Sequence, residues 1–161
     1  MQYRRIYRTP DGFSDLVMES DGIYLTDLSF FESFETELRE EELSVFEECK
    51  EWLDIYFGGE EPCFMPKYKL CGCTEFRMEV LDILISVPYG ETVTYGDIAA
   101  EIAKKRNIKR MSAQAVGGAV GRNPLSIIIP CHRVIGSDGS LIGYTGGIEN
   151  KRRLLRLEQG V

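Results

Sequence analysis

The chain of 161 residues has little of several features that define whole classes of protein. It contains one histidine and one tryptophan, and no apolar run approaches the roughly 18 residues that a membrane-crossing helix needs. Residues 1–5 lead into no signal-peptide core. The five cysteines are an odd number, which favours reduced thiols over a disulfide framework. We therefore expect a cytoplasmic protein with no membrane partner, built as one domain or two small ones.

Charge is distributed unevenly along the chain. The formal net charge is −7, but residues 1–73 hold 7 Lys and Arg against 17 Asp and Glu, whereas residues 74–161 hold 12 against 9. Such asymmetry is typical of a polyanion-binding part joined to an acidic part, although acidic helices are often no more than solvated faces. Hydrophobic residues at 43% and charged residues at 28% exclude a disordered chain.

The first half predicts a small antiparallel sheet followed by one helix. Turn residues separate three short apolar runs, Gln2–Thr9, Phe13–Met18 and Ile23–Leu28. An acidic stretch of helical spacing follows and stops at Gly58. Its apolar residues share one face: Leu43, Phe46, Trp52, Leu53 and Phe57. Residues 60–72 carry two prolines and predict a linker.

The second half predicts mainly helices. Thr74 can cap a helix that ends before Pro88, Thr94 opens a capping box, and Ser112 can cap a third helix over residues 113–120. Residues 126–129 are a short apolar run that suits a buried strand.

The last helix is predicted over residues 149–159, with Gly160 as its stop. Its basic residues are expected to be exposed: Lys151, Arg152, Arg153 and Arg156.

The helix predicted over residues 113–120 is almost without side chains. Gly117 and Gly118 lie in its interior, where each glycine costs about 1 kcal/mol relative to alanine. Close approach of the helix backbone to something bulky would explain this composition, and tight helix–helix packing is the alternative. A helix, a basic turn and a second helix resemble a helix-turn-helix.

These elements predict an α+β fold. Residues 1–70, linker included, are expected to form a small N-terminal antiparallel-sheet domain with one helix. Residues 71–161 are expected to form a mostly helical C-terminal domain that is winged-helix-like and carries the helix-turn-helix.

The candidate nucleophile is Cys131, which directly precedes the only histidine, His132. A thiolate attacks and a thiol does not, so the cysteine needs a group that takes its proton. Neighbouring side chains on an extended backbone point to opposite sides, which makes a bridging water the simpler relay. His132 in turn needs a carboxylate to set its tautomer, and spacing leaves three candidates: Asp138, Glu149 and Glu158. This interpretation requires a Cys131 sulfur that is ionised and open to a cavity.

The remaining cysteines are expected to be small buried hydrophobes: Cys49, Cys63, Cys71 and Cys73. The spacing of Cys71 and Cys73 is not that of a zinc-ligand pair, and the histidine lies far away. We expect neither a metal nor a cofactor.

Motifs throughout the second half resemble the methylated-DNA–protein-cysteine methyltransferases, which act on O6-methylguanine. The most specific is Pro130-Cys131-His132-Arg133-Val134. The resemblance continues in other segments: residues 87–95, 115–119, 123–124, 143–147 and 154–158. It covers nearly all of residues 74–161, whereas residues 1–70 resemble the family's variable N-terminal domain only in size, strand pattern and the stretch from Trp52 to Gly58.

The resemblance implies DNA repair by irreversible, single-turnover transfer of an alkyl group from O6-alkylguanine in duplex DNA to Cys131, after the base has flipped out through the minor groove. Activity on O4-methylthymine stays open. His132 would act as a base through water and Glu158 would orient it, which selects among the three acids. Asn123 would brace the active-site turn, and Tyr95 would contact the flipped base. The implied pocket residues are Tyr144, Thr145, Gly146 and Val134.

The same resemblance places the helix over residues 113–120 in the minor groove, which is only about 6 Å wide and admits only a nearly bare helix. The implied DNA contacts are Ser112, Ala113, Gln114, Ala115, Gly117, Gly118 and Arg122. Many family members have an arginine where this chain has Gln114, so we expect weaker DNA binding than in those proteins. We expect a monomer whose partner is alkylated duplex DNA.

Two other functions compete with this one. A non-catalytic sensor of alkylated bases that recruits other repair proteins would have no use for Cys131 in an intact Pro-Cys-His-Arg context. A cysteine hydrolase would need a direct Cys–His pair, which adjacent residues form poorly.

Overall fold

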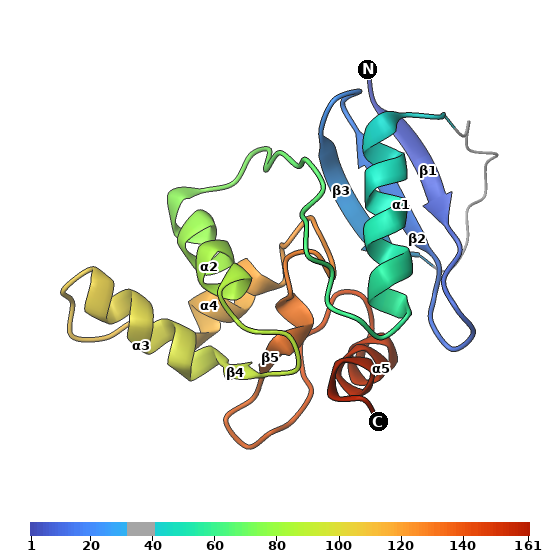
Figure 1. The fold of residues 1–161 in the computed structure, drawn as a ribbon. Coiled ribbons are helices and arrows are strands. Elements are labelled where there is room, and N and C mark those ends of the chain that lie inside the picture. Colours follow the sequence, from blue (N-terminus) through green and yellow to red (C-terminus); the bar gives the residue numbers. More distant parts are fainter. Residues whose placement is uncertain (32–40) are drawn as a thin grey trace.

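An antiparallel sheet opens the chain. Strands β1 (Tyr3–Tyr7), β2 (Leu16–Ser20) and β3 (Leu25–Phe30) lie in the order β1-β2-β3, and both pairs are antiparallel. In the computed structural model, which describes residues 1–31 and 41–161, helix α1 (Ser44–Phe57) packs against this sheet (Figure 1). The predicted sheet and single helix are therefore confirmed.

Strand β2 begins three residues and strand β3 two residues later than predicted, because the turns before them are longer. The Phe13 amide donates to the Pro10 carbonyl, and the Asp21 carboxylate accepts from the amides of Ile23 and Tyr24. These bonds keep the predicted first residues of the strands inside the turns.

Helix α1 buries the predicted face. Phe46, Trp52 and Leu53 are buried, and Gly58 ends the helix. Part of the linker that follows pairs with the start of β3. The Leu25 amide donates to the Lys67 carbonyl at 2.8 Å, and the Lys69 amide donates to the Leu25 carbonyl at 3.0 Å.

Helices dominate the second half. Helices α2 (Glu75–Ile85), α3 (Tyr95–Lys105) and α4 (Ala113–Val120) pack on one another, and α5 (Ile148–Gln159) ends at Gly160 in the left-handed conformation (Figure 1). Strands β4 (Val93–Thr94) and β5 (Val134–Ile135) form a parallel pair.

The three predicted helix caps are confirmed. The hydroxyl of Thr74 accepts from the Arg77 amide, Thr94 forms a capping box with Asp97, and Ser112 accepts from the Ala115 amide. Helices α3 and α4 with residues 106–112 between them therefore form the expected helix-turn-helix, and the α+β fold is confirmed.

The strand predicted over residues 126–129 is wrong. The segment is buried, but Ile127 has a φ of 71°, which no extended strand permits. The Ile128 amide donates to the Ser126 carbonyl and the Ile129 amide to the Leu125 carbonyl, so the chain turns instead of extending. The Leu28 amide donates to the Pro124 carbonyl at 2.8 Å, which joins this turn to β3. Both halves consequently contribute to one apolar core.

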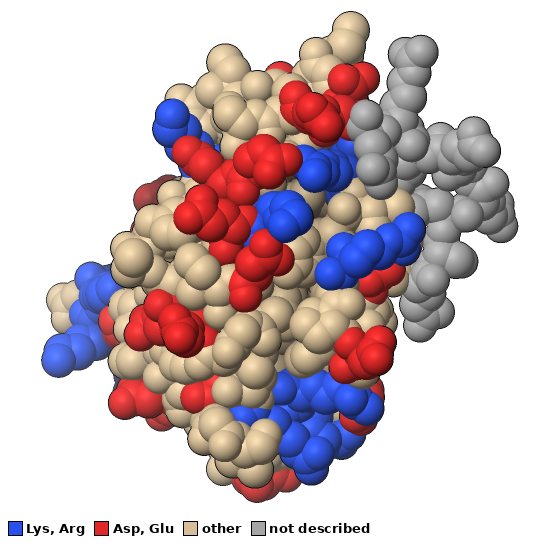
Figure 2. Space-filling model, turned by 45° about the vertical axis from the view of Figure 1, so that its right-hand side comes forward, with Lys and Arg blue, Asp and Glu red and all other residues tan. Residues whose placement is uncertain are grey.

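Charge follows the two halves of the fold. Figure 2 shows acidic side chains over the upper part of one face, with Lys and Arg among them, and a cluster of Lys and Arg at its lower end, where Figure 1 places α5. Residues 104–110, at the end of α3 and in the turn before α4, form a second exposed basic segment. No helix in the described part of the chain has both the length and the apolar character needed to cross a membrane.

Candidate active site

Cys131 lies in a short 3-10 turn, Cys131–Arg133, directly after Pro130. The turn replaces the extended backbone that we predicted, because the Cys131 amide donates to the Ile129 carbonyl and the Arg133 amide to the Pro130 carbonyl. The side chain of Cys131 is buried, with 6% of its surface exposed.

The Asn123 side chain holds the segment before this turn by hydrogen bonds to the main chain. Its amide nitrogen donates to the carbonyls of Ile129 at 2.8 Å and Leu125 at 3.3 Å, and its oxygen accepts from the Leu125 amide at 3.0 Å. A buried turn needs partners for its carbonyls, and Asn123 supplies them. Asn123 thus joins the turn before Cys131 to the segment that follows α4.

Glu158 is the acid that meets the histidine. Its Oε1 lies 2.7 Å from His132 Nε2, and both side chains are fully buried. Asp138 is exposed and bonded to Ser140, and Glu149 is exposed and paired with Arg152 and Arg153. Of the three acids that spacing left open, the structure brings only Glu158 to His132.

Burial alone would raise the pKa of the Glu158 carboxyl, but hydrogen bonds from His132 and Arg133 outweigh burial and lower that pKa to about 2. Arg133 donates from Nε at 2.9 Å and Nη2 at 2.8 Å, and its Nη1 binds the Val87 carbonyl. The Gly90 amide also donates to Glu158 at 3.3 Å. Glu158 is therefore an anion at neutral pH and can only accept hydrogen bonds.

This anion determines where the imidazole of His132 holds its proton. Because Glu158 cannot donate, Nε2 of His132 carries the hydrogen that joins them, which leaves the lone pair on Nδ1. Nδ1 is buried and has no hydrogen-bond partner in the described residues. Nδ1 is therefore the nitrogen of His132 that is free to accept a proton.

Cys131 rests as a thiol and His132 as a neutral imidazole. Burial raises the pKa of the Cys131 thiol, and the nearby Asn123 and Lys151 offset this only in part. Burial also lowers the pKa of His132 despite its bond to Glu158. Desolvation thus outweighs the groups that would stabilise the thiolate, so the ionised sulfur that the sequence interpretation requires must form when the thiol loses its proton to a base.

Lys151 is fully buried, which corrects the prediction that it is exposed. Its Nζ donates to the carbonyls of Val134 and Ile142 and lies 5.8 Å from the centre of the Tyr144 ring. The residue is one turn before Leu155 and two turns before Glu158, on the inward face of α5. Two carbonyls and a ring face replace the water that a buried ammonium loses.

The loop over residues 143–147 is held on both sides. The Tyr95 hydroxyl donates to the Ile142 carbonyl at 3.1 Å, and the Thr145 hydroxyl donates to the Gly121 carbonyl at 2.8 Å, next to the end of α4. Gly146 has no room for a side chain, because a Cβ there would lie 2.7 Å from the Phe30 ring and 2.9 Å from the Tyr144 ring.

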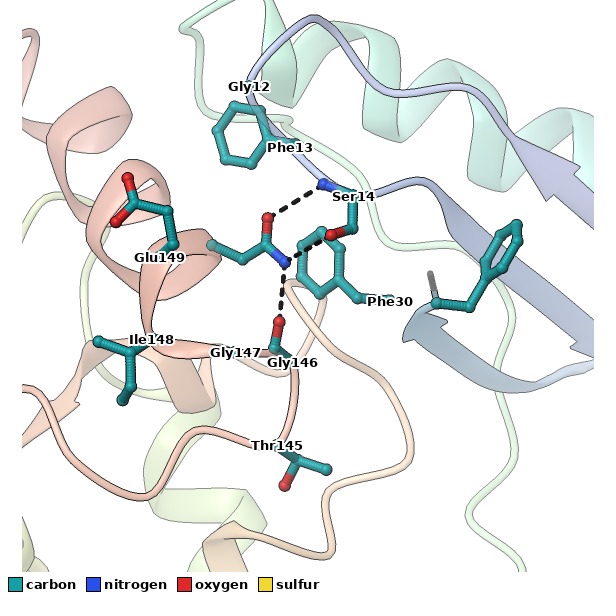
Figure 3. Close-up of a pocket in the computed structure, with 11 residues that line it drawn as sticks. Gly12, Phe13, Ser14, Phe30, Thr145, Gly146, Gly147, Ile148 and Glu149 are labelled. Carbon is teal, nitrogen blue, oxygen red and sulfur yellow. Dashed lines mark hydrogen bonds between the residues drawn. The ribbon is translucent and has the colours of Figure 1, made fainter. Parts of the chain in front are cut away.

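Asn150 ties the same loop to the N-terminal half. Its side chain accepts from the Ser14 amide at 3.1 Å and donates to the Ser14 hydroxyl at 3.1 Å and to the Gly146 carbonyl at 2.8 Å (Figure 3). The three residues that these bonds join line a cavity of about 630 Å³ between the turn at Gly12 and the start of α5. A residue of the first half therefore helps to place the predicted pocket loop.

Helix α4 presents a bare, exposed face. Its first residues are exposed from Ser112 to Ala115, and so are Gly118 and the following Arg122. A groove of about 630 Å³ lies on one side, lined by Tyr95, Gln114 and Gly117 among others, and a groove of about 310 Å³ lies on the other, between Arg77 and Arg122.

Packing inside the protein does not explain the glycines of α4. A Cβ at Gly118 would meet nothing within 4 Å, and one at Gly117 would make only ordinary contact with the Tyr95 ring at 3.8 Å. The tight-packing alternative therefore fails at Gly118, and close approach of an external partner remains.

Sequence reasoning missed several residues of the site: Tyr56, Arg77, Arg133 and Lys151. Arg133 stands inside the quoted motif, and Lys151 shares a helical face with Glu158, so both had a signal. Tyr56 lies inside the stretch from Trp52 to Gly58 that resembles the family, but its distance in sequence from His132 gave no sign that the two meet. Two of the cysteines predicted to be buried, Cys63 and Cys71, are exposed, while Cys49 is buried.

A helix-turn-helix with a bare second helix, next to a buried cysteine and a histidine–carboxylate pair, defines a class of DNA-binding protein with a cysteine centre. Residues 75–160 match the sequence profile of the 6-O-methylguanine DNA methyltransferase DNA-binding domain. Since this match covers more than half of the chain and relatives match nearly all of it, the chain belongs to the methylated-DNA–protein-cysteine methyltransferase family.

Relatives of known family match most of the chain. A methylated-DNA–protein-cysteine methyltransferase of Haemophilus influenzae is 38% identical over 161 residues, which cover 98% of this chain and 86% of that protein. One of Mycobacterium leprae is 48% identical over 73% of this chain and 68% of its own. The Mycobacterium tuberculosis OGT structure in complex with DNA has a TM-score of 0.82 at 38% identity and covers 98% of this chain and 93% of that one.

The buried carboxylate predicts a pH-dependent stability. The pKa of Glu158 falls from an ordinary 4.5 to about 2 on folding, so its contribution is complete above pH 4.5 and is lost as the pH falls towards 2. We expect Glu158→Gln to lower the free energy of unfolding by about 3 kcal/mol at neutral pH and by almost nothing near pH 2. Urea unfolding at several pH values measures this. Glu149→Gln, on the exposed face of the same helix, is the control, and an equal loss in both variants would contradict the assignment.

Proposed function

We propose that this protein repairs alkylated DNA by transferring the alkyl group of O6-alkylguanine in duplex DNA irreversibly to Sγ of its own Cys131. The observation that carries the proposal is the position of Cys131 on a rigid turn, beside a histidine whose tautomer a buried carboxylate sets. The exposed bare helix α4 and the family relationship support DNA as the partner.

The proposed reaction is a displacement at the alkyl carbon. His132 Nδ1 accepts the thiol proton through a bridging water, and the resulting thiolate attacks the carbon. The S–C bond forms as the C–O6 bond breaks, the electron pair stays on the guanine oxygen, and the proton that His132 accepted passes to a ring nitrogen of the released guanine. The product is a thioether, which is a poor leaving group, so each molecule acts once.

Resting as a thiol suits this chemistry. A buried thiol is protected from oxidation, and the thiolate forms only when the base and His132 are in place. Burial that disfavours the anion also makes the sulfur a stronger nucleophile once it is formed, since nucleophilicity rises with pKa.

We propose that the guanine reaches Cys131 by leaving the base stack. Cys131 does not line the groove beside α4, so the loop from Ile142 to Gly147 must yield when the base enters. The Tyr95 hydroxyl then releases the Ile142 carbonyl and forms a hydrogen bond with the base instead. Thr145 and Gly146 form one wall of the pocket with Tyr144, and the carbonyl of Val134 accepts from the exocyclic amine.

The proposed DNA-binding surface is the exposed face of α4, placed in the minor groove. A bare helix can approach the floor of that groove, and the groove carries little sequence information, which suits a protein that inspects all DNA. Gln114 fills the space that the flipped base leaves, and Arg122 contacts a phosphate. Arg77, which lines the second groove with Arg122, is a further candidate for such a contact.

A mass measurement tests the transfer. Duplex DNA that contains O6-methylguanine should add the mass of one CH2 to the peptide with Cys131, and Cys131→Ala should abolish the gain while DNA binding persists. Cys71→Ala, which removes an exposed cysteine, is the matched control and should transfer normally. Binding without any change in mass would instead identify a sensor, and turnover of an ester or peptide would identify a hydrolase.

Gly118→Ala separates stability from DNA binding. The new methyl group meets open space, so we expect the free energy of unfolding to rise by up to about 1 kcal/mol, because alanine favours a helix. DNA affinity should fall at least several-fold, because the methyl group keeps the helix from the groove floor. Urea unfolding and fluorescence anisotropy with a labelled duplex measure the two effects. Unchanged affinity would remove this face of α4 from the interface.

Gln114→Arg tests the missing positive charge. We expect tighter duplex binding, and the gain should shrink about threefold between about 50 and 200 mM salt, as one additional cationic contact implies. Gln159→Arg adds the same charge at an exposed position of α5 and should have a smaller effect. Equal gains in both variants would show that net charge alone is responsible.

A further inference from the structure

Tyr56 brings a hydroxyl group from the N-terminal half into the buried His132–Glu158 pair. The residue lies in the last turn of α1, and its hydroxyl donates to Oε1 of Glu158 at 2.9 Å. The hydroxyl oxygen of Tyr56 also lies 3.4 Å from Nε2 of His132. Tyr56 is 1% exposed, so this contact is shielded from water.

The ring of Tyr56 is held firmly from several sides. It stacks on Trp52 with centroids 5.5 Å apart and an interplanar angle of 6°, and it meets Tyr89 and His132 edge to face at 6.1 Å and 6.4 Å. Packing on this many neighbours fixes the direction of the hydroxyl before any substrate binds.

We infer that Tyr56 is a positioning residue of the transfer reaction: its hydroxyl holds the carboxylate of Glu158 and limits the basicity of His132. The inference rests on the proposed function, because the relay matters only if Cys131 must lose a proton. Tyr56 lies outside the alkyltransferase signature in residues 74–161. The inference therefore gives the N-terminal half a part in the chemistry.

One oxygen atom of Glu158 connects Tyr56 to His132. Oε1 of Glu158 receives His132 Nε2 at 2.7 Å, Arg133 Nη2 at 2.8 Å and the Tyr56 hydroxyl at 2.9 Å. Hydrogen bonds from three residues saturate this carboxylate oxygen, and each residue withdraws negative charge that the other two would otherwise share. The Tyr56 hydroxyl keeps its hydrogen throughout, since burial and the Glu158 charge raise its pKa well above 10.

Loss of that hydroxyl would change His132 in a defined direction. With one donor fewer, Oε1 carries more negative charge and stabilises the imidazolium form more strongly, so the pKa of His132 should rise. His132 must be neutral to accept the thiol proton, so the rate would then fall at a higher pH than before. The other groups that face His132 stay the same: Arg133 on its own turn, Lys151 and Glu158 on α5, and Cys131.

The experiment uses the full chain and its only histidine. Tyr56→Phe removes the hydroxyl and keeps the ring on Trp52, and NMR of the single imidazole reports its pKa and tautomer without ambiguity. Tyr7→Phe is the matched control, because it removes a hydroxyl that donates to Asp54 at 2.7 Å in the same half of the molecule. Single-turnover transfer rates over a range of pH complete the comparison.

We expect Tyr56→Phe to raise the pKa of His132 by a measurable fraction of a unit, because the roughly one-unit effect of losing a hydrogen bond to a charged acceptor falls on Glu158 and reaches His132 only in part. The acidic limb of the rate profile should move up by the same amount, and Tyr7→Phe should leave both unchanged. In the Glu158→Gln background, Tyr56→Phe should have no further effect on the pH profile. An unshifted titration and an unchanged profile in the folded Tyr56→Phe variant would overturn the inference.

A second variant covers the case in which Tyr56→Phe does not fold. Site-specific 3-fluorotyrosine at position 56 keeps the hydroxyl and makes it a stronger donor, so the pKa of His132 should move down. No shift would again overturn the inference. The titration is independent of DNA, so a wild-type protein that transfers no methyl group would contradict the proposed function while the coupling between Tyr56 and His132 is still measured.

Discussion

A single buried negative charge organises this protein. Glu158 lies in the core, where an ionised carboxylate is tolerated only when its oxygens are saturated with hydrogen bonds. Its donors come from three separate parts of the chain: Tyr56 on α1, the backbone of Gly90 before β4, and His132 with Arg133 on the 3-10 turn. The turn that carries Cys131 is therefore held in place by the same charge that sets the tautomer of His132.

The two halves of the chain meet along β3 and around this charge. Main-chain bonds join Leu28 to the turn after Pro124, and Asn150 links Ser14 to the carbonyl of Gly146. The first half thus contacts the proposed pocket in two places. Tyr56 contacts the His132–Glu158 pair, and Ser14 contacts the pocket loop through Asn150. We interpret it as part of the scaffold that holds the reacting groups, and its acidity as a surface property that keeps this half away from DNA.

Helix α4 shows a conflict between stability and the proposed contact. Two interior glycines weaken a helix of only eight residues, and nothing inside the protein requires Gly118. The Ser112 cap and packing of Val116 and Val120 in the core offset part of that loss. A surface that keeps unfavourable residues without an internal reason is typical of a functional surface.

Local interactions let the sequence alone determine much of this protein. Helix caps at Thr74, Thr94 and Ser112, the bare face of α4 and the Cys131–His132 pair depend on neighbours a few residues apart, so they could be predicted. Only the tertiary structure decided which acid meets His132, that Lys151 is buried, that residues 126–129 turn, and that Tyr56 joins the site. Each of these depends on desolvation or on hydrogen bonds between residues far apart in the chain, and no periodicity or spacing records such contacts.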